Sequence, residues 1–302
     1  MKVAAIQMVS GTQVEPNLRA ARALLAEAAA AGAELALLPE YFCVMGRRDT
    51  DKLALQEPLG HGPIQDWLAA AARELGLWIV GGTLPLACEP RDAERGRSAG
   101  PPQAEATAPS GGSAAREAAE RGGKCRNSSL AFNPQGERVA CYDKIHLFRF
   151  HDGSRLYDEA AVLARGSRPT LFDLPSRDGH RWRIGMSVCY DLRFPELYRA
   201  YAAEGADLLL VPSAFTYVTG QAHWEVLLRA RAIENLAGVV AAAQGGTHEN
   251  GRRTWGQSMV VDAWGQVLAQ QAEGAGVVLA ELDPAGLAAR RQQLPALTHR
   301  VL

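Results

Sequence analysis

The chain has 302 residues, enough for one large domain or two modest ones. Apolar residues make up 47% of the sequence and charged residues 22%, which is typical of a protein with a substantial buried core. Its 33 acidic and 32 basic residues nearly cancel, and this balance argues against a nucleic-acid partner and against a polybasic membrane anchor. No apolar run approaches the ~20 residues that a membrane-spanning helix needs.

The cysteines and the first residues predict where the protein works. The five cysteines are an odd number, form no CxxC pair and lack the spacing of a zinc finger. This pattern favours a reducing cytoplasm over a disulfide-bonded scaffold. Residues Met1–Gln7 are typical of a strand and lack the charged and apolar regions of a secretory signal. We therefore expect a cytoplasmic protein.

The first elements alternate between strands and helices. We expect a buried strand at Lys2–Gln7, a helix that begins near Pro16, and a second strand at Glu34–Leu38. A helix at Pro63–Leu75 and one strand at Leu77–Leu84 continue the alternation. Such an order is typical of an α/β fold.

The second half of the chain repeats this rhythm, and no linker divides it, so we predict a single domain over residues 1–302. Two helices and eight further strands are expected there. The helices are Phe194–Glu204 and Gln221–Asn235; the strands are Ser128–Asn133, Val139–Tyr142, Arg183–Val188, Asp207–Val211, Gly238–Ala243, Ser258–Asp262, Gln266–Ala269 and Val277–Leu282.

One segment departs from the pattern. Residues 88–124 contain no Ile, Leu, Val, Met, Phe, Trp or Tyr. Such a stretch buries too little apolar area to offset a backbone ordering cost of ~1–2 kcal/mol per residue. We predict a flexible surface insertion there; a tolerated insertion is favoured over a regulatory arm.

Three reactive side chains follow directly on buried strands, where a rigid strand delivers a group to the surface. Glu40 follows LLP, Lys144 stands in YDKIHLF, and Cys189 ends a strand before a tight turn into a helix. Taken singly, Glu40 could cap a backbone, Lys144 could be a surface lysine and Cys189 a small buried side chain. His146 is expected to be a hydrogen-bonded supporting or core histidine. The turn after Cys189 resembles a nucleophile elbow, whose backbone N–H groups can stabilise an oxyanion.

Together these motifs resemble the nitrilase superfamily of carbon–nitrogen hydrolases, with a Glu–Lys–Cys triad at Glu40, Lys144 and Cys189. The resemblance includes the opening VAAIQM and the block WGQSMVVDAWG, and it covers nearly the whole chain except residues 88–124. It implies a second glutamate, which Glu159 in YDEAAVLARG matches. It also implies an α/β fold of four layers, an α-β-β-α sandwich, and assembly into homodimers or higher homo-oligomers.

The chemistry of these side chains agrees with the resemblance. A free thiol has a pKa of ~8.5, so a base must take its proton at neutral pH. Glu40 can be that base, Lys144 and the Tyr190 N–H can stabilise the oxyanion, and Glu159 can assist. The substrate would be a small amide. No metal or other cofactor is required, and His146 is not needed as a base.

Within the superfamily, the segment PSAFTYVTGQAHWEVLLRARAIEN resembles the branch of deaminated glutathione amidases and omega-amidases, and the continuation is nearer to the former. The favoured substrate is therefore deaminated glutathione, cut to 2-oxoglutarate and cysteinylglycine. The alternatives are 2-oxoglutaramate or a simple aliphatic amide, and less favoured are a nitrilase and a catalytically silent binding protein.

The same segment supplies the predicted substrate-binding residues. Arg193 could hold an α-keto carboxylate in a bidentate clamp, although an ion pair with Asp191 or Glu196 is the alternative. Tyr190 stands beside the nucleophile. We expect three residues after the next strand to line the pocket and His223 and Trp224 to form part of its wall, with a core position as the alternative for Trp224. The three are Phe215, Tyr217 and Thr219.

Overall fold

The computed structural model describes residues 1–88, 123–151 and 156–301, and two large β-sheets dominate it. The first sheet has the order β18-β1-β2-β3-β5-β4, and β6 and β9 also pair with β5. The second has the order β10-β11-β12-β13-β16-β17. Strands of the first sheet are β1 (Lys2–Gln7), β2 (Leu35–Leu37), β3 (Trp78–Val80), β4 (Leu84–Ala87), β5 (Cys125–Phe132), β6 (Arg138–Asp143), β9 (Leu163–Ala164) and β18 (Gly276–Glu281). Strands of the second are β10 (Leu171–Pro175), β11 (Arg181–Met186), β12 (Leu208–Leu210), β13 (Gly238–Ala241), β16 (Ser258–Val261) and β17 (Val267–Gln271).

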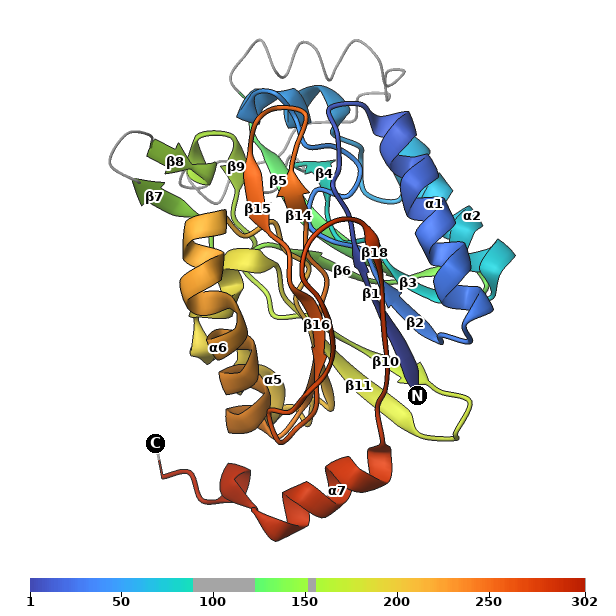
Figure 1. Cartoon of the computed structure of the whole chain (residues 1–302), viewed down its shortest axis with the longest axis vertical. Coiled ribbons are helices and arrows are strands. Elements are labelled where there is room, and N and C mark those ends of the chain that lie inside the picture. Colours follow the sequence, from blue (N-terminus) through green and yellow to red (C-terminus); the bar gives the residue numbers. More distant parts are fainter. Residues whose placement is uncertain (89–122, 152–155, 302) are drawn as a thin grey trace, which may run out of the picture.

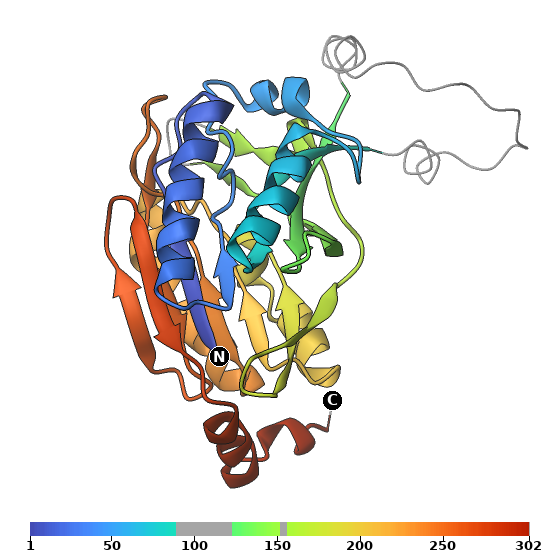
Figure 2. The same ribbon diagram turned by 90° about the vertical axis from the view of Figure 1, so that its right-hand side faces the viewer.

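Helices cover the outer faces of the two sheets, so the molecule has four layers (Figure 1). On one side stand α1 (Val14–Ala30) and α2 (Pro63–Leu75), next to each other in Figure 2, and on the other α5 (Pro195–Ala203) and α6 (Tyr217–Asn235). A further helix, α7 (Pro284–Gln293), lies near the C-terminus. The predicted α-β-β-α sandwich is confirmed.

The alternation of side chains along β1 shows how the layers form. Val3 and Ala5 pack into the core shared with the second sheet, whereas Ala4 and Ile6 pack with α1 and α2. Successive side chains of a strand point to opposite faces, and here both faces are buried. Because β1 is buried on both faces, its side chains from Val3 to Ile6 are apolar on both faces instead of alternating between apolar and polar.

The predicted strand Leu77–Leu84 is wrong as a single element, because the chain divides it into β3 and β4. Gly82 has a φ of 44°, and a Cβ there would lie 2.0 Å from the carbonyl oxygen of Pro39. The bend therefore needs glycine and carries the backbone past the turn that holds Glu40. Apolar residues on both sides of the bend disguised it in the sequence.

Several elements were not predicted, and one began earlier than expected. Helix α6 begins at Tyr217 rather than Gln221, which places Thr219 inside its first turns. Two short hairpins stand at the same end of the molecule (Figure 1). They are β7 (Arg149–His151) with β8 (Leu156–Asp158), and β14 (Gly245–Thr247) with β15 (Arg253–Trp255).

The predicted insertion at residues 88–124 lies almost wholly outside the described residues. Its flanking strands, β4 and β5, are antiparallel neighbours, with Ala87 opposite Cys125. Within the described ranges, none of the helices has the length and apolar character needed to cross a bilayer.

Candidate active site

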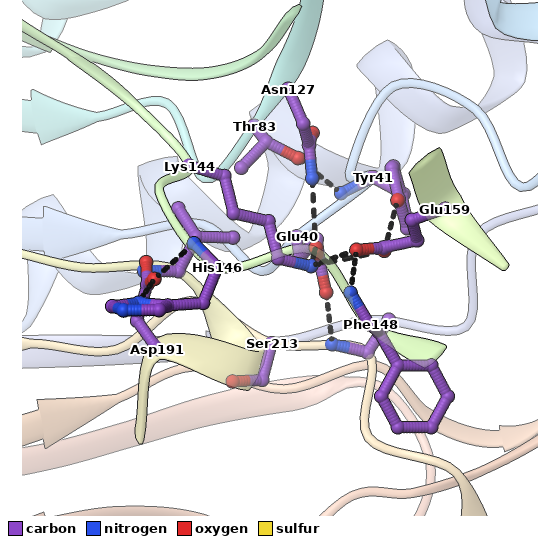
Figure 3. Close-up of polar contacts among 12 residues, drawn as sticks. Glu40, Tyr41, Thr83, Asn127, Lys144, His146, Phe148, Glu159, Asp191 and Ser213 are labelled. Carbon is purple, nitrogen blue, oxygen red and sulfur yellow. Dashed lines mark hydrogen bonds and ion pairs between the residues drawn. The ribbon is translucent and has the colours of Figure 1, made fainter. Parts of the chain in front are cut away.

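The predicted site residues come from both sheets and meet at one end of the sandwich. Glu40 follows β2 and Lys144 follows β6, both in the first sheet, and Glu159 begins a 3-10 helix (Glu159–Ala161) after β8. Cys189 follows β11 of the second sheet and begins another 3-10 helix (Cys189–Arg193). Figure 3 shows the two carboxylates converging on the lysine. We call Glu40, Lys144 and Glu159 the carboxylate–lysine cluster.

Lys144 binds both carboxylates of the cluster. Its Nζ lies 2.9 Å from Glu40 Oε1 and 3.0 and 2.8 Å from the two carboxylate oxygens of Glu159. The Lys144 and Glu40 side chains are each 1% exposed. Burial alone would lower the lysine pKa, but the two carboxylates outweigh it and raise that pKa well above its ordinary value. Lys144 is therefore a cation throughout the neutral range.

Two further donors fix Glu40. Asn127, on β5, donates from Nδ2 to Glu40 Oε1 at 2.8 Å, and the Ala214 N–H donates to Oε2 at 2.9 Å. Asn127 was not predicted: it stands among the polar residues Arg126, Ser128 and Ser129, just before the predicted strand Ser128–Asn133, so nothing local in the sequence marked it. The carboxylate is held from both sheets, because Ala214 follows β12.

Glu159 is fixed in a similar way, on the other side of Lys144. It accepts hydrogen bonds from the Phe148 N–H at 2.8 Å and the Tyr41 hydroxyl at 3.0 Å. Tyr41 in turn accepts from the buried Lys52 at 3.1 Å. Burial opposes ionisation of Glu159, but Lys144 and then Lys52 lower its pKa below the ordinary value. Neither Tyr41 nor Lys52 was predicted from the sequence.

Cys189 has the backbone of a nucleophile elbow. Its φ is 50°, a left-handed conformation that costs energy for any residue but glycine and is concentrated at functional sites. Its own N–H donates to the Pro212 carbonyl at 2.9 Å. The next amide, that of Tyr190, lies at the start of the short helix, where N–H groups have no acceptor within the helix.

The thiol of Cys189 is protonated at rest. Burial, and next the negative charge of Glu40, raise its pKa well above the ordinary value, although Lys144 lowers it. The side chain is 8% exposed. A proton acceptor is therefore required before the sulfur can attack, and Glu40 is the adjacent carboxylate.

His146 supports the elbow rather than facing the substrate. Its Nδ1 lies 2.7 Å from Asp191 Oδ1, and its ring stacks on Phe194 with 3.7 Å between centroids. Asp191 also accepts from the Tyr142 hydroxyl at 2.7 Å and the Val188 N–H at 2.8 Å. The prediction of a hydrogen-bonded supporting histidine agrees with this geometry.

Cys189 and the two carboxylates of the cluster, Glu40 and Glu159, line a cavity of about 370 Å³, and Lys144 lies behind them. All four predicted substrate-binding residues line it: Tyr190, Arg193, Phe215 and Thr219. Tyr217 lines it as expected, together with several unpredicted residues of the β14–β15 hairpin, Asn250, Gly251, Arg252, Arg253 and Thr254.

The remaining two predicted residues lie elsewhere. Trp224 is 1% exposed and donates from its ring to the Gln257 carbonyl at 2.8 Å, so it is a core residue. His223 is exposed, and its Nδ1 lies 3.2 Å from Arg193 Nη1. The expected alternatives for Arg193, ion pairs with Asp191 or Glu196, are not among the contacts of the described residues.

Comparisons with known proteins agree with this geometry. The family model "Carbon-nitrogen hydrolase" matches residues 2–292. The chain is 37% identical over 300 residues to deaminated glutathione amidase of Synechocystis sp. (strain PCC 6803 / GT-S), covering 99% of this chain and 97% of that protein. It is 31% identical to omega-amidase NIT2 of Homo sapiens, covering 99% and 94%. A mutant amidase from Nesterenkonia sp. AN1, whose active-site cysteine has added acrylamide, superimposes with a TM-score of 0.69 at 26% identity, covering 98% of each chain. The chain therefore belongs to the carbon–nitrogen hydrolase family and is an enzyme that hydrolyses amide carbon–nitrogen bonds.

Proposed function

We propose that this enzyme cleaves deaminated glutathione to 2-oxoglutarate and cysteinylglycine through a thioester on Cys189. The observation that carries the chemistry is the buried carboxylate–lysine cluster beside a protonated thiol in a left-handed elbow. Each member of the cluster is held by two or more hydrogen bonds, so its groups are oriented before substrate arrives.

In the first half of the reaction, Glu40 takes the thiol proton as the sulfur attacks the amide carbon. The carbon–oxygen double bond opens and its electron pair becomes an oxyanion. Lys144 has three N–H groups: one serves Glu40, one can be shared between both oxygens of Glu159, and the third is free to bind the oxyanion. The Tyr190 N–H is the second donor, and one such donor contributes ~3–4 kcal/mol in other hydrolases.

In the second half, the proton held by Glu40 passes to the departing amine, and the carbon–nitrogen bond breaks to leave the thioester. Glu40 then removes a proton from water, which attacks the thioester carbon. The sulfur leaves and regains the proton, so each group returns to its initial state. Glu159 keeps Lys144 oriented and charged through both halves.

The preference for an α-keto acid amide rests on Arg193. This residue lines the cavity, and its guanidinium packs against Phe215, with 5.4 Å from the guanidinium carbon to the ring centroid. His223 accepts one of its N–H groups, because arginine can only donate. The remaining N–H groups can clamp a carboxylate in bidentate fashion. The similarity to the Synechocystis amidase supports the same substrate class.

A substrate panel tests the proposal. Release of amine or ammonia would be measured with deaminated glutathione, 2-oxoglutaramate, glutamine, a nitrile and an N-carbamoyl amino acid. The proposal expects the highest kcat/KM on deaminated glutathione. A higher value on 2-oxoglutaramate would assign the omega-amidase activity instead, and a higher value on the nitrile would contradict both.

We further propose that the enzyme acts as a homodimer, or a higher homo-oligomer, in the cytoplasm. The outer side of α6 exposes Val218, Val226 and Ile233, which are 68%, 69% and 47% exposed. Burial of these side chains against a second copy would remove apolar surface from water. Cys43, Cys125, Cys141 and Cys189 carry free thiols, which is the state that a reducing compartment maintains. Light scattering on the wild type and on Val226→Asp would test the dimer: the variant should be the smaller species.

A further inference from the structure

Besides Arg193, the cavity wall carries a second arginine whose guanidinium is positioned by an aromatic ring. The guanidinium carbon of Arg253 lies 3.7 Å from the centroid of Tyr217, and the Tyr217 and Trp255 rings form a T-shaped pair with 5.0 Å between centroids. Stacking on an aromatic face holds a guanidinium in a defined plane while leaving its N–H groups available. We call Arg193 and Arg253 the two wall arginines.

Backbone pairing fixes the relation between them. Thr216 forms an antiparallel bridge with Thr254, and the Trp255 N–H donates to the Phe215 carbonyl at 3.0 Å. This register places Arg253 alongside Tyr217, one side chain beyond the bridge. Phe215, which packs on Arg193, is two residues earlier, a span of about 7 Å along extended backbone. The two guanidiniums therefore stand over neighbouring aromatic rings on the same wall.

The charges around Arg253 leave it available for a ligand. Arg252, the preceding residue in the chain, is held by Asp49 at 2.6 Å. The carboxylate paired with Arg253 is that of Glu273, at 3.8 Å, and these two side chains are 49% and 56% exposed. An exposed pair at this distance contributes little, so a ligand carboxylate can replace it.

We propose that Arg253 binds a second carboxylate, carried by the amine half of the amide, while Arg193 holds the carboxylate of the acyl half. This inference rests on the proposed function and refines it: the site selects amides that carry a carboxylate on both sides of the scissile bond. Deaminated glutathione has both, since its amine half ends in a glycine carboxylate. 2-Oxoglutaramate has only the α-keto carboxylate, and Arg253 therefore distinguishes the two candidate substrates.

Arg253→Gln and Arg253→Lys test the assignment on three substrates: deaminated glutathione, its C-terminal amide, and 2-oxoglutaramate. For Arg253→Gln we expect kcat/KM on deaminated glutathione to fall by about 10- to 100-fold, mainly through KM, since a charge-assisted hydrogen bond is lost. On the other two substrates the change should be below about threefold, because they lack the second carboxylate. Arg253→Lys keeps the charge but lacks the planar guanidinium, so its kcat/KM on deaminated glutathione should lie between those of the wild type and Arg253→Gln.

Arg181→Gln is the matched control, since Arg181 is an exposed arginine of β11 that does not line the cavity. It should leave all three substrates unchanged. Equal losses of the Arg253 variants on all three substrates, or no loss on deaminated glutathione, would overturn the inference. Failure of the wild type to cleave deaminated glutathione would instead overturn the proposed function, so the two failures are distinguishable.

Discussion

The carboxylate–lysine cluster and the two wall arginines border the same cavity but are built differently. Lys144 and Glu40 are almost wholly buried, and protein hydrogen bonds hold each of them in place, whereas Arg253 is half exposed and pairs only distantly with Glu273. Arg193 has His223 as its polar partner among the described contacts. The fold orients the carboxylate–lysine cluster before substrate arrives. The two wall arginines have N–H groups that are available to bind the substrate.

The difference teaches which properties each region controls. Charges in the buried cluster act in a medium of low dielectric, so each change there alters both chemistry and folding. Changes at the wall arginines should alter substrate choice while the fold is retained. Four experiments can break or sharpen this contrast. The first three are ordered from the largest expected loss of rate to the smallest, and the fourth measures the smaller effect of one charge on the pKa of the nucleophile.

Cys189→Ala should reduce kcat by about 10⁴- to 10⁶-fold, the range found when a covalent nucleophile is removed. The alanine removes the only atom that can form the thioester, and it fits the same buried space. Single-turnover assays and thermal unfolding would be measured together. An activity above a few per cent of wild type would argue against covalent catalysis at this residue.

Lys144→Met should lower kcat by at least about 10²- to 10³-fold, because the oxyanion loses its charged donor. It should also destabilise the fold by roughly 3–5 kcal/mol, since Glu40 is left as a buried carboxylate without its cation and Glu159 keeps only the charge of Lys52. Chemical denaturation and kinetics on the folded fraction separate the two effects. A stable variant with near-normal kcat would remove Lys144 from the mechanism.

Arg193→Lys should reduce kcat/KM on deaminated glutathione or 2-oxoglutaramate by about 10- to 100-fold, since lysine keeps the charge but loses the bidentate fork. A neutral aliphatic amide has no carboxylate to hold and should be affected much less. The melting temperature should be close to that of wild type. Equal losses on charged and neutral amides would mean that Arg193 is structural.

Glu40→Gln should abolish turnover yet lower the pKa of the Cys189 thiol. After burial, the Glu40 charge is the next cause of that raised pKa, and Lys144 lowers it, so removing the negative charge favours the thiolate. The rate of iodoacetamide labelling at Cys189 would be followed against pH by mass spectrometry. Its midpoint should move to lower pH than in wild type; a midpoint at the same or higher pH would contradict the arrangement.

Cys43 is the internal control for that experiment. Burial raises its pKa to about 12, with Glu57 as the charge that adds to the shift. Its labelling should therefore be slow in both proteins and should not respond to Glu40→Gln.

The sequence predicted the layers and the reactive side chains better than their supports. Glu40, Lys144 and Cys189 stood out because each follows an apolar strand, and strand ends are visible in one dimension. The resemblance of their motifs to the nitrilase superfamily then assigned them to one site and supplied the order of the layers. Asn127, Tyr41 and Lys52 act through residues distant in the chain, and no local pattern encodes such contacts.

The same reason explains what was missed at the cavity wall. Arg253 lies on a strand of three residues, too short for periodicity to detect, and it meets Tyr217 only because two distant segments pair. The division of Leu77–Leu84 was hidden because its cause, the close approach of Gly82 to Pro39, is also a tertiary contact.

The hydrogen bond from the Ala214 N–H to Glu40 has a consequence for the molecule as a whole. Glu40 follows a strand of the first sheet, while Ala214 and Cys189 follow strands of the second. The base and the nucleophile therefore belong to different sheets, and the side chains packed between the two sheets set the distance between them. A misplacement of a catalytic group by about 1 Å can lower the rate 10²-fold. The turnover rate therefore depends sensitively on the distance between the two sheets. Removal of a methyl group from the core between the two sheets should therefore change the rate constant even at a position that does not contact the substrate.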